Sequence, residues 1–261
     1  MSRSSDQFKT IMITGATGDL GSALAILYAA PGVTLALTGR NPNKLQQIEQ
    51  HCRELGAEVN SEALDITDLA AIEQWVTEFD AMQPVDLIIA NAGTTNSIGS
   101  NGESETWIDI QRVIDTNVYG TLASITPLVN SMRDRKSGHI AIVSSLAGYI
   151  GMPITPIYSA SKAAIKVYGE ALRGSLASSG VNVSVICPGF VKSSMSDQYP
   201  GATPFMISAE KAAQIIRRGL TKNKACIAFP FPLNLGTWLL TILPASISGK
   251  ILNHMKLSAS D

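Results

Sequence analysis

The chain has 261 residues, of which 45% are hydrophobic and 16% are charged, and its formal net charge at pH 7 is −1. A chain of this length and composition buries an extensive core, and one domain over residues 1–261 is the simplest expectation. The near-zero net charge gives no electrostatic footprint for nucleic acid, so we expect no nucleic-acid partner.

The three cysteines, Cys52, Cys187 and Cys226, are scattered along the chain and lack the spacing of metal ligands. We therefore expect no metal site, and a reducing compartment suits such free thiols. Residues 1–9 are polar and contain no apolar run typical of a signal peptide. These features favour a cytoplasmic protein.

The first predicted element is a buried strand over residues 10–14, which runs directly into a glycine-rich turn and an apolar helix over residues 20–30. This order is typical of a phosphate-binding site, because glycines let the backbone approach a pyrophosphate and the helix N-terminus presents free N–H groups. A plain tight turn is the alternative. The candidate phosphate-binding residues are Gly15, Thr17, Gly18, Asp19, Leu20 and Gly21.

A second strand is predicted over residues 33–38, and it ends at Gly39 and Arg40. In dinucleotide-binding sheets an acidic residue near this strand end holds the ribose 2′-hydroxyl of NAD, whereas a nearby arginine accommodates the 2′-phosphate of NADP. Arg40 therefore favours NADP(H) as the cofactor, with NAD(H) as the alternative. A surface arginine that opens the next helix is the other interpretation of this residue.

Strands and helices alternate along the rest of the chain as far as residue 229. Strands are predicted over residues 58–64, 85–90, 140–143, 181–186 and 225–229, and helices over residues 42–55, 105–135, 155–179 and 208–220, with a further helix near Trp75. The alternation predicts an α/β fold, a Rossmann-like doubly wound parallel sheet of about seven strands whose core spans about residues 10–229. Ligands of such sheets bind at the carboxyl ends of the strands.

One predicted helix carries a candidate proton-transfer pair. Thr155 is its expected N-cap and Pro156 its first residue. Tyr158 and Lys162 then lie four residues apart on one helix face. A free tyrosine has a pKa near ~10, and a neighbouring ammonium favours the phenolate and lowers that pKa. A packing tyrosine beside a solvated lysine is the alternative.

Two serines, Ser144 and Ser145, end the preceding strand, where a hydroxyl can hydrogen-bond the substrate oxygen that the tyrosine protonates or deprotonates. This Ser-Tyr-Lys order behind a glycine-rich turn resembles the short-chain dehydrogenase/reductase (SDR) family over about residues 10–228. In that family the catalytic serine stands thirteen residues before the tyrosine, which is the position of Ser145 and not of Ser144. The resemblance implies hydride transfer between a nicotinamide and a carbonyl or secondary alcohol.

The resemblance also implies roles for other residues. By it, Asn117 is a catalytic residue that anchors a water on the proton path, while Tyr158 and Lys162 also contact the cofactor. The acid of NAD-dependent relatives would occupy Gly39. The further cofactor-binding residues that it implies are Asp65 and Ile66 at the adenine, Asn91, Ala92 and Gly93 beside the sheet edge, and Pro188, Gly189, Val191 and Ser193 near the nicotinamide. From spacing alone, Asn117 is an ordinary polar helix residue and Asp65 a helix cap.

The glycine turn departs from the usual family pattern. It reads TGxxGxxG, whereas the core branch reads TGxxxGxG and the extended branch of epimerases and dehydratases is closer to this chain. Asp19 stands where the usual pattern has glycine, and it either caps the helix or places an anion near the cofactor phosphates. Thr17 stands where many NADP-dependent relatives have a basic residue. An epimerase or dehydratase is an alternative function, which the 73 residues after Pro188 disfavour because the sugar-nucleotide domain of that branch is larger.

Residues 194–207 lack a clear periodicity and are predicted to form a substrate lid. Apolar residues in and near this lid favour an apolar carbonyl or alcohol substrate: Met195, Tyr199, Phe205, Met206, Leu146, Tyr149 and Met152. Because relatives often pair through two long helices, we also expect a homo-oligomer, a dimer or a tetramer.

An apolar tail follows the core over residues 230–261. Pro244 and Lys250 interrupt it, so it lacks the ~20 continuous apolar residues of a membrane-spanning helix. Two interpretations remain open, a helix pair that covers the core or a subunit interface, and an apolar flap that contacts a membrane surface or a lipid-like substrate. An NADP-binding sensor or scaffold that uses this tail without turnover is a further alternative function, although such a protein does not need the Ser-Tyr-Lys set.

Overall fold

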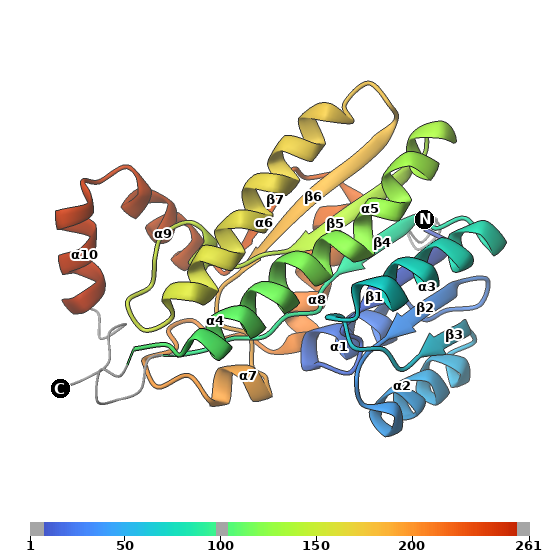
Figure 1. Ribbon diagram of the computed structural model, residues 1–261, viewed down its shortest axis with the longest axis horizontal. Helices are drawn as coiled ribbons and strands as arrows, with labels where there is room; N and C mark the ends of the chain where they lie inside the picture. The colour runs from blue at the N-terminus through green and yellow to red at the C-terminus, as the bar shows by residue number, and fades with distance from the viewer. Residues whose placement is uncertain (1–7, 98–103, 255–261) are drawn as a thin grey trace.

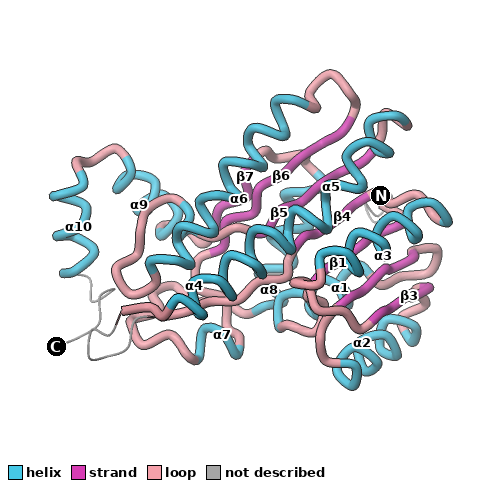
Figure 2. The backbone as a smooth tube through the Cα atoms, in the orientation of Figure 1, coloured by secondary structure: helices cyan, strands magenta, loops and turns pink. Residues whose placement is uncertain are grey.

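The computed structural model describes residues 8–97 and 104–254, which form a single α/β domain around a seven-stranded parallel sheet (Figures 1 and 2). The strands lie in the order β3-β2-β1-β4-β5-β6-β7, which confirms the predicted doubly wound sheet. Their bounds are β1 (Thr10–Thr14), β2 (Thr34–Thr38), β3 (Glu58–Glu62), β4 (Leu87–Ala90), β5 (Gly138–Val143), β6 (Val181–Pro188) and β7 (Cys226–Phe229). The order reverses between β1 and β4, which is where sheets of this kind bind their ligands.

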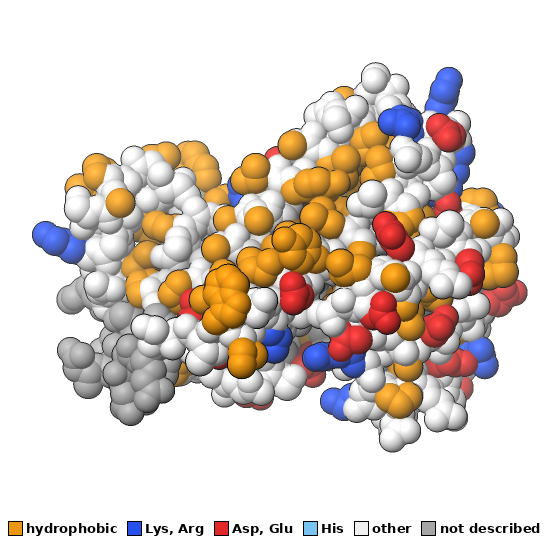
Figure 3. Space-filling view, in the orientation of Figure 1, with side chains coloured by type: hydrophobic (Ala, Val, Ile, Leu, Met, Phe, Trp, Pro, Cys, Tyr) orange, Lys and Arg blue, Asp and Glu red, His pale blue; other side chains and the backbone are white. Residues whose placement is uncertain are grey.

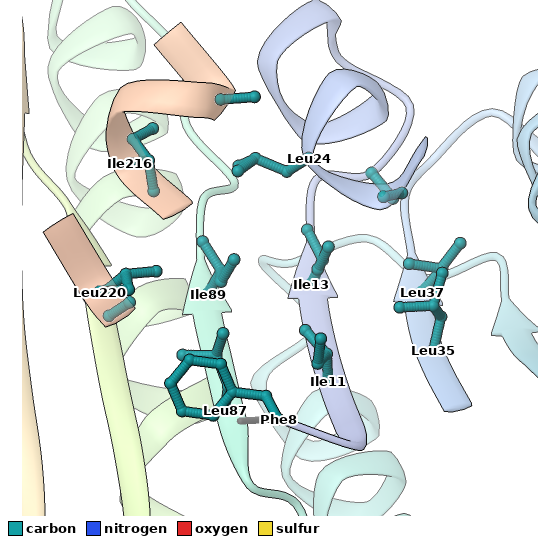
Figure 4. Packing of buried hydrophobic residues seen from close by; sticks show 14 of the residues in the cluster. Phe8, Ile11, Ile13, Leu24, Leu35, Leu37, Leu87, Ile89, Ile216 and Leu220 are labelled. Carbon is teal, nitrogen blue, oxygen red and sulfur yellow. The ribbon is translucent and has the colours of Figure 1, made fainter. Parts of the chain in front are cut away.

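Helices cover both faces of the sheet (Figure 1). One face is covered by α1 (Asp19–Tyr28), α2 (Pro42–Glu54) and α8 (Ala209–Thr221), and the other by α3 (Leu69–Met82), α5 (Gly120–Asp134) and α6 (Pro156–Ser175). Because successive side chains of a strand point to opposite faces, each central strand contributes to both cores. Ile11 and Ile13 of β1 lie in the core beneath Leu24 of α1, as Figure 4 shows, whereas Met12 lies in the other core.

The segment predicted as one helix over residues 105–135 is helical but changes its winding. α4 (Trp107–Ile114) continues through a π-helical turn, η1 (Asp115–Tyr119), into α5. A π-helical turn fits one extra residue into the helix, and such turns occur often at functional sites. The apolar pattern of the sequence predicts the helical span but gives no sign of the extra residue.

The start of α6 confirms one predicted signal and corrects another. Pro156 stands in the first turn, but Thr155 at the N-cap position forms no side-chain capping hydrogen bond among the described residues. The helix ends at Ser175, not near residue 179, because the chain turns toward Gly180, whose φ of 71° belongs to the left-handed region. β3 similarly ends two residues before its predicted end.

The apolar tail forms a helix pair, α9 (Leu233–Thr241) and α10 (Ala245–His254), separated at Pro244. Figure 1 shows this pair to one side of the sheet, near the start of α6. Within residues 8–97 and 104–254, no helix is long and apolar enough to cross a bilayer. The last residues of the predicted tail, from 255 onward, and part of the predicted loop at 94–104 lie outside the described residues.

Candidate active site

The glycine turn after β1 is packed so tightly that two of its glycines admit no side chain. Gly15 has a φ of 66°, and a Cβ on it would lie 2.7 Å from the Cα of Ala92. A Cβ on Gly21 would lie 2.2 Å from the carbonyl oxygen of Gly15. Gly18 differs, since a Cβ there would meet nothing closer than 3.5 Å. Gly15 and Gly21 are therefore required by packing, whereas Gly18 is not.

Asn91, at the end of β4, holds this turn in place. Its Nδ2 donates to the carbonyl oxygens of Thr14 at 3.1 Å and Gly15 at 3.2 Å. The hydroxyl of Thr14 in turn accepts from the backbone N–H groups of Asn91 at 3.1 Å and Ala92 at 3.2 Å. Sequence reasoning missed Thr14, although a threonine at the last position of a strand before a glycine turn is a signal that points to such a brace.

Asp19 lies in the first turn of α1, and Gly18 is the N-cap residue, so Asp19 is not itself the cap. The Asp19 carboxylate accepts from the backbone N–H of Ser194 at 3.0 Å and lies 3.4 Å from the Ser194 hydroxyl. Ser194 is the first residue of a short helix, α7 (Ser194–Asp197). The carboxylate therefore connects the glycine turn to the predicted lid.

Two neighbouring positions follow β2, Gly39, where a side chain would be crowded, and Arg40, which is exposed. A Cβ on Gly39 would lie 2.6 Å from the Thr17 Oγ1, so a side chain there requires Thr17 to move.

The Asp65 carboxylate accepts from the N–H and hydroxyl of Thr67, and these bonds, with the charge of Arg40, lower its pKa. This arrangement is an Asx turn after β3. Ile66 beside it is buried and contacts the α5 helix at Gly120.

The two serines after β5 have different surroundings. The Ser144 hydroxyl is buried and donates to the carbonyl oxygen of Lys162 at 2.7 Å, which ties the strand end to α6. Ser145 is only half-buried, lies 3.4 Å from the Pro188 carbonyl oxygen, and caps the short 3₁₀ helix η2 (Leu146–Gly148). Ser144 thus has a structural role, whereas Ser145 lies at the sheet edge and stays the predicted catalytic serine.

Lys162 reaches from α6 to the same edge. Its side chain is 4% exposed, its Nζ donates to the Val143 carbonyl oxygen at 2.9 Å, and the same Nζ lies 5.8 Å from the centre of the Tyr158 ring. Burial lowers the pKa of Lys162 to about 8. Tyr158 and Lys162 of α6 thus come together with Ser145, which follows β5 and caps η2.

The expected lowering of the Tyr158 pKa is wrong for this arrangement. Burial raises the pKa of Tyr158, and its hydrogen bond with Ser145 only partly offsets that rise. Burial is the main cause of this rise, and the Lys162 ammonium is engaged by the Val143 carbonyl oxygen. The phenol is therefore protonated at neutral pH.

Asn117 lies in the π-helical turn and is completely buried. Its Oδ1 accepts from the Thr94 N–H at 2.8 Å, and its Nδ2 donates to the Thr94 carbonyl oxygen and the Ser161 hydroxyl, each at 2.9 Å. A Cβ on Gly93 would lie 3.3 Å from both the Asn117 Oδ1 and the Lys162 Nζ. The asparagine thus fixes the loop after β4 beside the lysine, and the lack of a side chain on Gly93 permits that approach.

The segment after β6 carries the predicted nicotinamide contacts. The Gly189 N–H donates to the Phe229 carbonyl oxygen at 2.7 Å, and a Cβ on Gly189 would lie 2.9 Å from the Leu233 side chain. Val191 forms a parallel bridge with Ile207. Ser193 is the N-cap of α7, and its hydroxyl accepts from the Ser196 N–H at 3.1 Å and donates to the Val191 carbonyl oxygen at 3.2 Å. Its hydroxyl is therefore already engaged within the protein.

Several of the residues predicted to line an apolar substrate pocket make separate contacts within the protein. Leu146 is buried beside Cys187, a free thiol whose pKa is raised by its hydrogen bond with Cys226 and by burial. Tyr149 directs its hydroxyl to the Cys226 sulfur at 3.1 Å. In the predicted lid, Tyr199 packs on Phe190 with ring centres 5.2 Å apart. The lid is thus anchored at both its start and its middle.

Comparisons with known proteins agree with this geometry. A family model described as short chain dehydrogenase matches residues 9–202. An uncharacterized oxidoreductase of Myxococcus xanthus is 34% identical over 238 residues, which are 91% of this chain and 93% of that protein. Dehydrogenase/reductase SDR family member 7B of Danio rerio is 33% identical over 201 residues, which are 73% of this chain but 63% of that protein.

Two solved structures share the fold. A short-chain dehydrogenase from Sphingobium yanoikuyae in complex with NADPH superposes with a TM-score of 0.79 at 23% identity, over 94% of each chain. A short chain dehydrogenase/reductase from Burkholderia phymatum in complex with NAD superposes with a TM-score of 0.79 at 24% identity, over 89% of this chain and 92% of that one. One of these structures carries NADPH and the other NAD, and at these identities the likeness shows that the fold is shared.

Proposed function

Because the chain belongs to the short-chain dehydrogenase/reductase family, we propose that it is an NADP(H)-dependent oxidoreductase that transfers a hydride between the nicotinamide and a carbonyl or secondary alcohol. The observation that carries this proposal is the meeting of Ser145, Tyr158 and Lys162 at the carboxyl edge of the sheet, beside the end of β5. When bound, the nicotinamide supplies or accepts the hydride, and the protein supplies the proton transfer.

The glycine turn fits a dinucleotide. The glycine turn has no side chain at Gly15 or Gly21, where a Cβ would clash with neighbouring backbone. A turn whose backbone N–H groups are accessible at a helix N-terminus suits a pyrophosphate. The carboxylate of Asp19 is engaged with Ser194, so it is directed to the lid. The residues that would hold the pyrophosphate are Gly15, Thr17, Gly18, Leu20 and Gly21, with Asp65, Ile66, Asn91, Ala92 and Gly93 beside the adenosine and ribose.

The NADP(H) preference rests on the end of β2. Arg40 is exposed there, and the contact between Gly39 and Thr17 opposes an acidic side chain that would hold a 2′-hydroxyl. A guanidinium pairs well with a phosphate because both are charged and the pairing is bidentate. Arg40 therefore has the position and chemistry to bind the 2′-phosphate.

The protonation states suit a reduction. The raised pKa of Tyr158 keeps its phenol protonated, so the Tyr158 hydroxyl can donate a proton to the substrate oxygen while the Ser145 hydroxyl orients that oxygen. The Lys162 ammonium, whose pKa is about 8, favours the phenolate that remains. In the oxidation direction the same phenolate accepts the proton.

Proton return to Tyr158 would pass along Lys162 and a water at the π-helical turn. Both N–H groups of the Asn117 amide are already donated to protein groups, so the side chain positions the turn and offers only acceptor sites to a water. Asn117 is thus a positioning residue for the relay as well as a brace for the loop at Thr94.

We also propose that the chain forms a homo-oligomer through α4 and α6. Exposed apolar side chains gather on these helices and on the turn that follows α4, namely Trp107, Ile108, Tyr119, Val167 and Tyr168. Figure 3 shows hydrophobic side chains over α4 and the helices beside it. A second copy would cover this surface, and Val167→Glu should then reduce the mass measured by light scattering.

The cofactor proposal is tested by titrating wild type and Arg40→Ala with NADPH and with NADH. We expect the variant to lose NADPH affinity by about ten- to a hundredfold, which corresponds to a charge-assisted bond of about 1.5–3 kcal/mol, while its NADH affinity stays unchanged. Arg133→Ala, at an exposed arginine on α5, is the matched control. Equal NADPH and NADH affinities in wild type would overturn the NADP preference. If wild type binds neither cofactor, a non-catalytic scaffold replaces the proposed enzyme.

A further inference from the structure

The helix pair α9–α10 and Phe231, two residues before it, present a large apolar surface, which we call the hairpin patch. Its exposed side chains are Phe231, Leu235, Trp238, Leu239, Ile242, Leu243, Ile247 and Ile251. Soluble surfaces usually scatter such residues singly, and a contiguous group marks an interaction site. Trp238 is 49% exposed and Ile242 is 65% exposed, so the patch is not closed by the protein's own core.

The segment that carries the patch has basic but no acidic residues from residue 225 to residue 260, although the whole chain has 21 acidic residues. Lys250 lies within α10 and Lys256 follows it in the sequence. An apolar surface with a lysine on α10 and no carboxylate on α9 or α10 is complementary to an anionic lipid surface, because the headgroups attract the lysine while the acyl region accepts the apolar side chains.

We propose that the hairpin patch docks on the surface of an anionic lipid bilayer. Tryptophan favours the headgroup region of bilayers, which suits the place of Trp238 among aliphatic neighbours. α9 has 9 residues and α10 has 10. At about 1.5 Å per residue each helix reaches only about 15 Å, half of the ~30 Å hydrocarbon core. The hairpin therefore lies on the bilayer and does not span it.

The root of the hairpin gives the patch a fixed position on the domain. Leu233, at the start of α9, lies against Gly189 at the carboxyl edge of the sheet, and the Asn234 Nδ2 donates to the Ala228 carbonyl oxygen at 3.0 Å. Beside this root is a groove of about 360 Å³ lined by Tyr149, Ala228, Phe231, Asn234, Leu235 and Trp238. Its mostly apolar walls provide a continuation of the patch that suits an acyl chain.

A second copy of the chain is the competing occupant. The apolar surface on α4 and α6 lies on other elements, so a pair of chains does not need the hairpin. The absence of acidic residues also favours lipid, because neither α9 nor α10 has a carboxylate that would pair with Lys250 of another copy. The lipid bilayer and the second copy can be distinguished by vesicle binding and by the size of the oligomer.

The test is flotation with vesicles of phosphatidylcholine and phosphatidylglycerol, and with vesicles of phosphatidylcholine alone. The hairpin variant combines Trp238→Ser with Ile242→Ser. The matched control combines Leu69→Ser with Met82→Ser, two exposed apolar residues of α3. We expect wild type and control to float with the anionic vesicles and the hairpin variant to lose about tenfold or more in partitioning. Lys250→Glu should weaken binding to the anionic vesicles only.

A fluorescence measurement keeps the test independent of variant folding. The chain has three tryptophans. Trp75 is buried, so Trp107→Phe leaves Trp238 as the accessible fluorophore. Brominated acyl chains in the anionic vesicles should quench this emission. Absence of quenching, or equal flotation of wild type and the hairpin variant, would overturn the proposal. A smaller oligomer for the hairpin variant, with no vesicle binding by wild type, would assign the patch to a second copy instead.

Discussion

The carboxylate of Asp19 accepts a 3.0 Å hydrogen bond from the backbone N–H of Ser194, a residue 175 positions away in the chain. This bond joins the first turn of α1 to the first turn of α7. The sequence alone places Asp19 where a glycine is usual and leaves a choice between a helix cap and an anion near the cofactor phosphates. The structure gives the carboxylate a third partner, the lid.

Asp19→Gly should therefore loosen the lid without harming the cofactor site. Loss of a charge-assisted hydrogen bond worth about 1.5–3 kcal/mol when buried, and less at this exposed position, should speed amide exchange at Ser194 by about tenfold. NADPH affinity should stay equal or rise, because a negative charge is removed near the phosphates. Exchange measured on wild type, Asp19→Gly and the neighbouring control Ser22→Ala checks this. Unchanged exchange at Ser194 would show that the bond does not hold the lid.

The two glycines that flank Asp19 in the turn should respond differently to alanine. A Cβ at Gly21 meets the Gly15 carbonyl oxygen at 2.2 Å, whereas one at Gly18 meets nothing closer than 3.5 Å. Gly21→Ala should lower the free energy of unfolding by about 1–3 kcal/mol, as overpacking does, and abolish cofactor binding. Gly18→Ala should unfold as wild type does. Chemical denaturation of both variants gives the answer, and equal losses would contradict the packing argument.

Reversal of the cofactor preference should require two changes. Gly39→Asp alone supplies the acid of NAD-dependent relatives but places its Cβ 2.6 Å from the Thr17 Oγ1. We expect that single variant to bind both cofactors more weakly, and the Gly39→Asp/Thr17→Gly pair to bind NADH better than NADPH. Calorimetric titration of the single and double variants tests the coupling. If the single variant already prefers NADH, Thr17 is not an obstacle.

His139 should make the fold sensitive to acid. It is buried on β5, its Nε2 lies 2.8 Å from the Ser184 hydroxyl, and burial lowers its pKa from 6.5 to about 4. Between these values the unfolded chain binds a proton that the folded chain does not, so stability falls as the pH drops from 6.5 toward 4. The shift corresponds to about 3 kcal/mol. The free energy of unfolding should be measured across this pH range for three proteins: wild type, His139→Gln and the exposed-site control His51→Gln. We expect it to fall with pH in wild type and in His51→Gln, but not in His139→Gln.

Much of the architecture was predictable because it depends on local patterns. Apolar runs identify the strands around Ile13 and Ile89, whereas the choice of Ser145 over Ser144 depends on the family resemblance and stays a prediction. The contacts of Asp19 and Asn117 were not predictable, because each joins segments distant in sequence. The protonation of Tyr158 also depends on its burial and on its hydrogen bond with Ser145, which the four-residue spacing does not determine.

The most direct test of the account is turnover by Tyr158→Phe, compared with Tyr168→Phe, an exposed tyrosine on the same helix. NADPH consumption is followed against a panel of apolar aldehydes and ketones, and NADPH affinity is measured alongside. We predict that Tyr158→Phe loses about 10²–10⁴-fold in kcat, the usual contribution of a general acid, while its NADPH affinity and the kcat of Tyr168→Phe remain at wild-type levels. Unchanged turnover in Tyr158→Phe would contradict the proposed mechanism.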